Sequence, residues 1–93
     1  MPEAELNLYN FLKNIINAAE KNDEKEVSKL KDIYESLLKK TFKHLKDFYT
    51  NEKVLQYDRC YQFILSWIGI KERREEFLKK AKIAFDNIQK PES

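Results

Sequence analysis

The side chains that could do nucleophilic chemistry in this chain are one cysteine, Cys60, and one histidine, His44. A thiolate forms at neutral pH when a base or a cation lies beside it, so His44 would have to pack against Cys60, with Asp58 orienting the imidazole. Cys60, however, lies on the apolar side of a predicted helix, where burial raises the pKa of a thiol. We therefore expect Cys60 to be a small buried hydrophobic residue, and we expect no catalytic site.

Metal binding and acid–base catalysis have no better basis in the sequence. A structural zinc ion takes about four Cys, His or carboxylate ligands at set spacings, and the chain has one Cys and one His. Adjacent carboxylates such as Glu75 and Glu76 point to different sides of a helix and have lysines nearby, which is typical of a solvated surface. The single glycine cannot build a phosphate-binding loop. The sequence thus predicts no metal, no cofactor, no small-molecule substrate and no enzyme.

Length and composition predict one small domain of 93 residues. A chain of this size buries only about 60–65% of the surface that its unfolded form exposes, and one cysteine cannot form an internal disulfide. That cysteine suits a reducing compartment, the first residues lack the pattern of a signal peptide, and no apolar run reaches membrane-spanning length. We therefore expect a cytoplasmic protein. The Lys-rich composition is typical of a thermophile or of A·T-rich coding sequence.

The spacing of apolar residues predicts helices throughout the chain. Apolar positions recur every three or four residues, and the interior contains one glycine and no proline, so turns for a β-sheet are absent. The predicted helices cover about residues 2–20, 24–49, 52–69 and 70–89. Asp23 and Glu26 predict a capping box, and a break is favoured near Gly69. The predicted fold class is all-α: a small antiparallel bundle of three to four helices, with one long central hairpin and the third helix in the middle of the core.

One face of the first predicted helix carries uncharged amides. Asn7, Asn10, Asn14 and Asn17 follow heptad spacing, and Lys21 continues the series. Two interpretations stay open: a solvated face whose composition follows codon usage, or a polar contact face for another helix.

The third predicted helix is unusually apolar. In the stretch YDRCYQFILSWIGI, residues 57–70, the apolar arc covers about 220°, more than one neighbour in a small bundle can cover. Such a helix is central in the core, or it also faces a partner. Large aromatic side chains suit both settings, so the sequence does not separate them. The candidate partner-binding residues are Tyr57, Tyr61, Phe63 and Trp67.

Two basic segments lead to a different hypothesis. Lysines line one side of the second predicted helix, and two arginines would extend this side if the fourth helix lay alongside. The candidate basic face consists of Lys39, Lys40, Lys43, Lys46, Arg73 and Arg74. A continuous basic face of this kind is what nucleic-acid binding needs. Interspersed acidic residues and a net charge of only +2 dilute it.

The function expected from the sequence is a small helical protein–protein interaction module. It would be an accessory or adaptor subunit of a larger complex, or a homodimer, and it would dock through the apolar and aromatic face of the third helix. The alternative is a nucleic-acid-binding protein, or a small accessory subunit of a replication or transcription machine, that uses the Lys/Arg face. A protein partner or self-association is thus expected, with nucleic acid as the alternative partner and no membrane.

Overall fold

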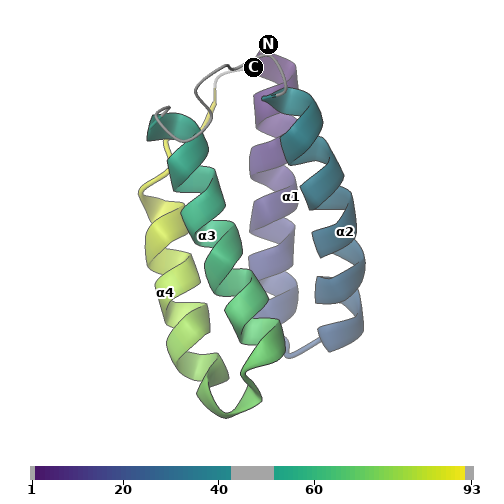
Figure 1. Cartoon of the computed structure of the whole chain (residues 1–93), viewed down its shortest axis with the longest axis vertical. Helices are drawn as coiled ribbons and strands as arrows, with labels where there is room; N and C mark the ends of the chain where they lie inside the picture. The colour runs from purple at the N-terminus through teal and green to yellow at the C-terminus, as the bar shows by residue number, and fades with distance from the viewer. Residues whose placement is uncertain (1, 43–51, 92–93) are drawn as a thin grey trace.

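The computed structural model describes residues 2–42 and 52–91. In these ranges the chain forms α1 (Pro2–Glu20), α2 (Glu24–Thr41), α3 (Glu52–Gly69), the short 3-10 helix η1 (Lys71–Arg73) and α4 (Arg74–Asp86). The four α-helices run alternately up and down, so α1 begins and α4 ends at the same end of the bundle (Figure 1). This is the antiparallel arrangement that short connections favour, and it confirms the predicted all-α bundle.

The helix ends differ from the prediction at two places. α2 ends at Thr41, with Phe42 at its C-terminal cap, and the predicted continuation over residues 43–49 lies outside the described residues. The predicted helix over residues 70–89 is shorter, because Ile70 leaves the helical conformation with φ −115° and ψ 83°, and η1 follows it. The chain thus breaks after Gly69, as favoured, although Gly69 itself does not adopt the left-handed conformation of a glycine cap.

The turn between α1 and α2 satisfies the backbone groups of both helices. Asn22 has a φ of 55°; its N–H donates to Ala19 O at 2.9 Å, and the N–H of Asp23 donates to Ala18 O at 3.0 Å. This pattern is a Schellman motif. The Asp23 carboxylate then accepts a hydrogen bond from the N–H of Glu26 at 3.2 Å and caps α2. Only this half of the predicted capping box forms, because the Asp23 N–H already donates to Ala18.

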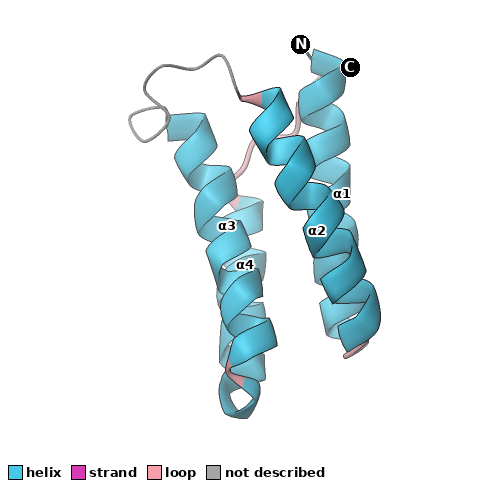
Figure 2. Ribbon diagram, turned by 45° about the vertical axis from the view of Figure 1, so that its right-hand side comes forward, coloured by secondary structure: helices cyan, strands magenta, loops and turns pink. Residues whose placement is uncertain are grey.

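The helices pack as two hairpins around one core. α1 packs along α2 and α3 packs along α4, and Figure 2 shows the two pairs side by side. Side chains from both pairs fill the space between them, because neither hairpin can bury its apolar side alone. The largest side chains that are buried almost completely are Leu8, Leu12, Ile15, Val27, Tyr34, Val54, Tyr57, Cys60, Ile64 and Trp67.

Aromatic rings bridge the two hairpins. Tyr34 on α2 contacts Tyr61 on α3 with ring centroids 5.0 Å apart, and Phe42 approaches Tyr57 at 6.1 Å. We call these four residues the aromatic layer. Tyr61 donates its hydroxyl hydrogen to Glu35 Oε2 at 3.3 Å, whereas the buried hydroxyls of Tyr34 and Tyr57 have no hydrogen-bond partner among the described residues. Burial raises the pKa of both hydroxyls, so they stay neutral.

The unpaired hydroxyl of Tyr34 generates a stability prediction. We expect Tyr34→Phe to leave the free energy of unfolding unchanged or to raise it by up to about 1 kcal/mol, because it keeps the ring and removes a buried group whose desolvation no hydrogen bond offsets. Urea denaturation followed by circular dichroism measures this difference. Tyr61→Phe is the matched control and should lower the same free energy by about 0.5–1.5 kcal/mol, because it removes the bond to Glu35. A loss for Tyr34→Phe as large as that of the control would contradict the prediction.

Candidate interaction surfaces

The structure places three of the four predicted partner-binding residues in the core. Trp67 is 2% exposed, and Tyr57 and Tyr61 are also buried. Phe63 is partly buried and packs against the core, so part of its surface stays accessible. A partner could contact the three buried side chains only if the two hairpins separated. In the folded chain these residues therefore hold the bundle together, and partner binding by them stays a prediction.

Arg74, a predicted member of the basic face, instead joins the two hairpins at their loop end. Its guanidinium stacks over the Trp67 ring, 4.0 Å from the centroid, and its Nε donates to Trp67 O at 2.9 Å. Its Nη1 donates to Asn22 Oδ1 at 3.3 Å. Its Nη2 lies 3.3 Å from Glu24 Oε2 as an ion pair, without the orientation of a hydrogen bond. We call Arg74 with Trp67, Asn22 and Glu24 the Arg74 clasp.

The position of the clasp separates the predicted basic residues. Glu24 is the first residue of α2, whereas Lys39 and Lys40 lie in its last turn, about 22 Å farther along the helix axis. Arg74 is bound to the Glu24 end, and Arg73, its neighbour in the chain, pairs with Glu76. The predicted extension of the basic face by the two arginines therefore does not form. Lys43 and Lys46 lie outside the described residues.

The clasp generates a second stability prediction. We expect Arg74→Ala to lower the free energy of unfolding by about 1–3 kcal/mol, because the side chain is only 16% exposed and its removal loses a ring contact and two hydrogen bonds. Thermal and urea denaturation would measure the loss. Arg73→Ala is the control: its side chain is 55% exposed and its ion pair with Glu76 is solvated, so its effect should be clearly smaller. Equal effects of the two variants would remove the special role of Arg74.

Cys60 lies in the core between α3 and α4. The residue is completely buried, and its Sγ donates to Ala81 O at 3.3 Å. Burial, with a smaller contribution from the Asp86 carboxylate, raises the pKa of the thiol to about 12. A thiol with this pKa holds almost no thiolate at neutral pH. His44, the proposed base, lies outside the described residues, and within the described residues no three metal-ligating side chains are grouped.

A labelling experiment tests the environment of Cys60. At about pH 8 we expect a disulfide reagent to modify the folded protein at least about a hundredfold more slowly than free cysteine, because the thiol is buried and protonated. The rate should keep rising above the ordinary pKa of a free thiol rather than level off there. Urea should restore rapid labelling. Fast modification of the folded protein would instead revive Cys60 as a candidate nucleophile.

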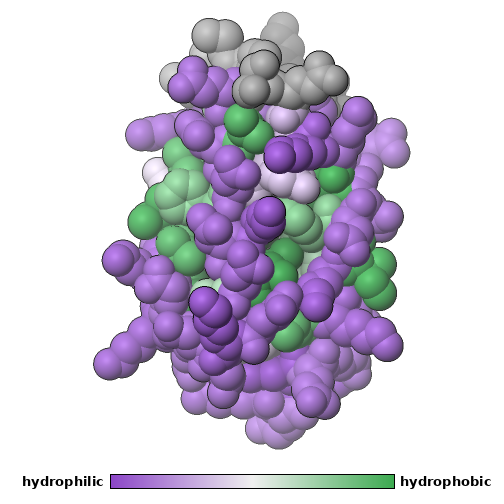
Figure 3. Space-filling model, turned by 180° about the vertical axis from the view of Figure 1, so that it is seen from behind, coloured by the Kyte–Doolittle hydropathy of each residue, from purple (hydrophilic) through white to green (hydrophobic). Residues whose placement is uncertain are grey.

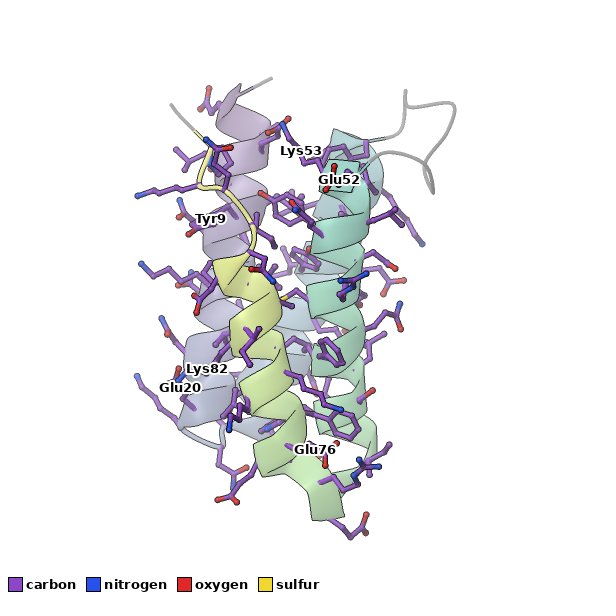
Figure 4. The ribbon with its side chains drawn as sticks, turned by 90° about the vertical axis from the view of Figure 1, so that its left-hand side faces the viewer. Tyr9, Glu20, Glu52, Lys53, Glu76 and Lys82 are labelled. Carbon is purple, nitrogen blue, oxygen red and sulfur yellow. The ribbon has the colours of Figure 1, made fainter. Side chains whose placement is uncertain are left out.

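The most exposed large apolar side chain of the described residues lies on α4. Ile83 is 55% exposed, and a shallow groove of about 370 Å³ runs beside it along the outside of the helix. The residues that line this groove are Glu75, Leu78, Lys79, Lys82, Ile83 and Asp86. We call them the α4 surface. Figure 4 looks onto α4, where Lys82 reaches Glu20 on α1 with a 3.3 Å ion pair that fixes one edge of this surface.

The α4 surface is absent from the sequence prediction, which placed the candidate partner-binding residues on the third helix. The buried residues of α4 are Phe77, Ala81 and Ala84, with Ile88 just beyond its end. Ile83 falls outside this buried series, and its side chain is exposed beside charged residues. An isolated apolar residue on a charged helix face was thus the available signal, although single exposed apolar residues are common.

Comparisons with known proteins find no match: no protein-family model, no curated protein and no solved structure matches the chain. Within the part of the chain that the structure describes, no helix is long and apolar enough to span a lipid bilayer.

Proposed function

We propose that this protein is a small helical protein–protein interaction module, an accessory or adaptor subunit that docks onto a partner through the α4 surface. The observation that carries the proposal is the exposure of Ile83, which is 55% exposed at one edge of a groove whose middle is lined by charged residues. Protein interfaces combine exposed apolar side chains with charged and polar ones, and this surface offers both. The proposal keeps the function expected from the sequence and moves the docking site from α3, whose aromatic residues are buried, to α4.

The chemistry of the α4 surface favours an amphipathic helix as the bound element. The groove lies along α4, and its two apolar residues Leu78 and Ile83 are five positions apart, about 140° around the helix, so they lie on opposite sides of its charged residues. A partner helix with an apolar and a charged side could contact Ile83 and these charges together. Two lysines and two carboxylates line the groove. A partner with charges of both signs would match them, and the pairing would set its direction more than its affinity.

The alternative of nucleic-acid binding has less support. Phosphate contacts need a basic face that is continuous and not neutralised. Among the described residues, Arg73 and Arg74 pair with acids, and Lys39 lies 3.6 Å from Glu35. The α4 surface carries as many acidic as basic residues. We therefore propose a protein partner, and we keep nucleic acid as an outcome that the experiment can detect.

A pull-down from the native host with matched variants tests the proposal. The tagged protein should retain a stoichiometric protein after nuclease treatment and a high-salt wash. Ile83→Lys should lose at least about 90% of it, because an unpaired lysine buried against a partner costs affinity. Ile33→Lys is the control: Ile33 on α2 is 40% exposed and lies outside the α4 surface. Circular dichroism should show both variants folded.

Three results would contradict the proposal. Retention of the partner by Ile83→Lys would place the contact elsewhere. Equal loss in Ile83→Lys and Ile33→Lys would indicate a non-specific effect of the added charge. Release of all bound material by nuclease or by salt would favour the nucleic-acid alternative.

A further inference from the structure

The outer side of α1 carries a row of exposed side chains that are not used by the fold. We call this row the α1 stripe; its members are Glu3, Asn7, Asn10, Asn14 and Asn17 on α1, and Lys21 in the turn that follows directly. All six residues are exposed, and no hydrogen bond or ion pair joins their side chains to other described residues. At 3.6 residues per turn the stripe lies opposite the buried side of α1, which carries Leu8, Leu12 and Ile15.

The back of the bundle shows the setting of the stripe. Figure 3 looks onto the side on which α1 lies, and hydrophilic side chains form a band along the long axis there, with hydrophobic side chains on both sides of it. The middle of the stripe differs from the other solvent-facing helix surfaces because its four central residues are uncharged amides. An amide offers both a donor and an acceptor, so it can pair with another amide, including a copy of itself.

The spacing of the stripe is that of a helix–helix seam. Its members follow one another at alternating steps of four and three residues, which is the a/d pattern that keeps one side of a helix against a partner helix. Asparagine at such positions weakens a coiled coil but specifies its register and the number of strands. The interpretation of a polar contact face for another helix, left open by the sequence, therefore has a definite geometry.

The stripe is also symmetric in sequence, and this symmetry identifies the partner helix. Glu3 and Lys21 lie nine residues on either side of position 12, and the inner pairs Asn7 with Asn17 and Asn10 with Asn14 are centred on the same position. Two antiparallel copies of α1 related by a two-fold axis at this point would place each member opposite its mate, as a self-complementary interface requires. Amide would face amide, and acid would face base at both ends.

We propose that two copies of this protein form a two-fold symmetric dimer in which the α1 stripe of one copy pairs antiparallel with the α1 stripe of the other. Glu3 of each copy pairs with Lys21 of the second copy, which gives two ion pairs, and the amides hydrogen bond between them. A parallel dimer would set Glu3 against Glu3 and Lys21 against Lys21, so the end charges select the antiparallel direction. The antiparallel helix dipoles act in the same sense.

The residues beside the stripe determine how strong the dimer is. On one side the partly exposed Phe11 lies next to the axis and adds apolar contact, whereas Ala18, which follows it by seven residues, is buried in the core. On the other side Lys13 of each copy lies near the axis and repels its counterpart. A seam of four amides with few apolar contacts gives weak association, so we expect a dissociation constant between about 10 μM and about 1 mM. The inference goes beyond the proposed function, because it concerns a second copy of this chain and residues of α1 rather than the α4 surface.

Sedimentation equilibrium with charge reversals tests the proposal. The unchanged protein should show a concentration-dependent mass between one and two copies. Glu3→Lys and Lys21→Glu should each raise the dissociation constant about tenfold, because two attractive pairs per dimer become repulsive. The double variant E3K/K21E should return it to within about threefold of the original value, although both new charges are unfavourable for the α1 dipole. This rescue distinguishes pairing between copies from a loss of helix stability.

Two further variants make the experiment decisive. Asn10→Lys combined with Asn14→Lys places like charges at the centre of the seam and should abolish the dimer, while circular dichroism shows the fold retained. Glu72→Lys, an exposed charge reversal in η1, is the control and should leave the dissociation constant unchanged. A protein that stays monomeric at about 1 mM overturns the proposal, and so does a dimer that none of the stripe variants weakens. If Ile83→Lys alone disrupts the dimer, self-association uses the α4 surface and the stripe is solvated.

Discussion

The contact between the two helical hairpins is the constraint on which the rest of this structure depends. Each hairpin is a pair of helices with one apolar side, and in so small a chain that side can be buried only by the other hairpin. At the middle and at one end of the bundle the contact is made by the rings of the aromatic layer. At the loop end it is made by Arg74, which reaches from α4 across Trp67 to the turn between α1 and α2.

This contact also explains which surfaces are left for binding. The hairpins meet through Tyr34, Tyr57, Tyr61 and Trp67, so the most distinctive side chains of the sequence are internal. The charges on the surface largely pair within the molecule, as Lys53 does with Glu5 at 3.1 Å and Lys82 with Glu20. Among the described residues, Ile83 on α4 and the amides of α1 are two groups of exposed side chains without such internal partners. They lie on different helices but adjoin one another, because Asn17 of α1 borders the same pocket as Lys82 and Asp86 of α4.

The sequence predicted the helices because their determinants are local. The apolar period sets α1 and α3, Asp23 supplies the N-cap of α2, and the change of direction after Gly69 follows the end of a strongly apolar run. The sequence could not predict how the 220° apolar arc of α3 is covered, because that depends on the placement of other helices. Arg74 illustrates the difference: in the sequence it is one of several basic residues, and only the fold brings Trp67, Asn22 and Glu24 around it.

The candidate surfaces also depend partly on local sequence and partly on how the helices pack. Whether Ile83 is exposed depends on which side of α4 faces the core. The buried residues Phe77, Ala81 and Ala84 mark that side once the bounds of α4 are known. The amides of α1 could be recognised in the sequence as unusual, whereas their position directly opposite the buried side of the helix needed the packed bundle. The sequence left open whether the fourth helix lies alongside the lysines of the second; in the structure Arg74 is bound at Glu24, the opposite end of α2 from Lys39 and Lys40.

The stacking of Arg74 on Trp67 has a consequence for how this protein can be observed. Trp67 is the only tryptophan in the chain, and the cation 4.0 Å above its ring belongs to the contact between the hairpins. Its fluorescence therefore responds to the approach and separation of the hairpins, even when all four helices stay intact. The native chain thus contains an optical probe at the contact between the two hairpins, and no label has to be introduced to follow their separation.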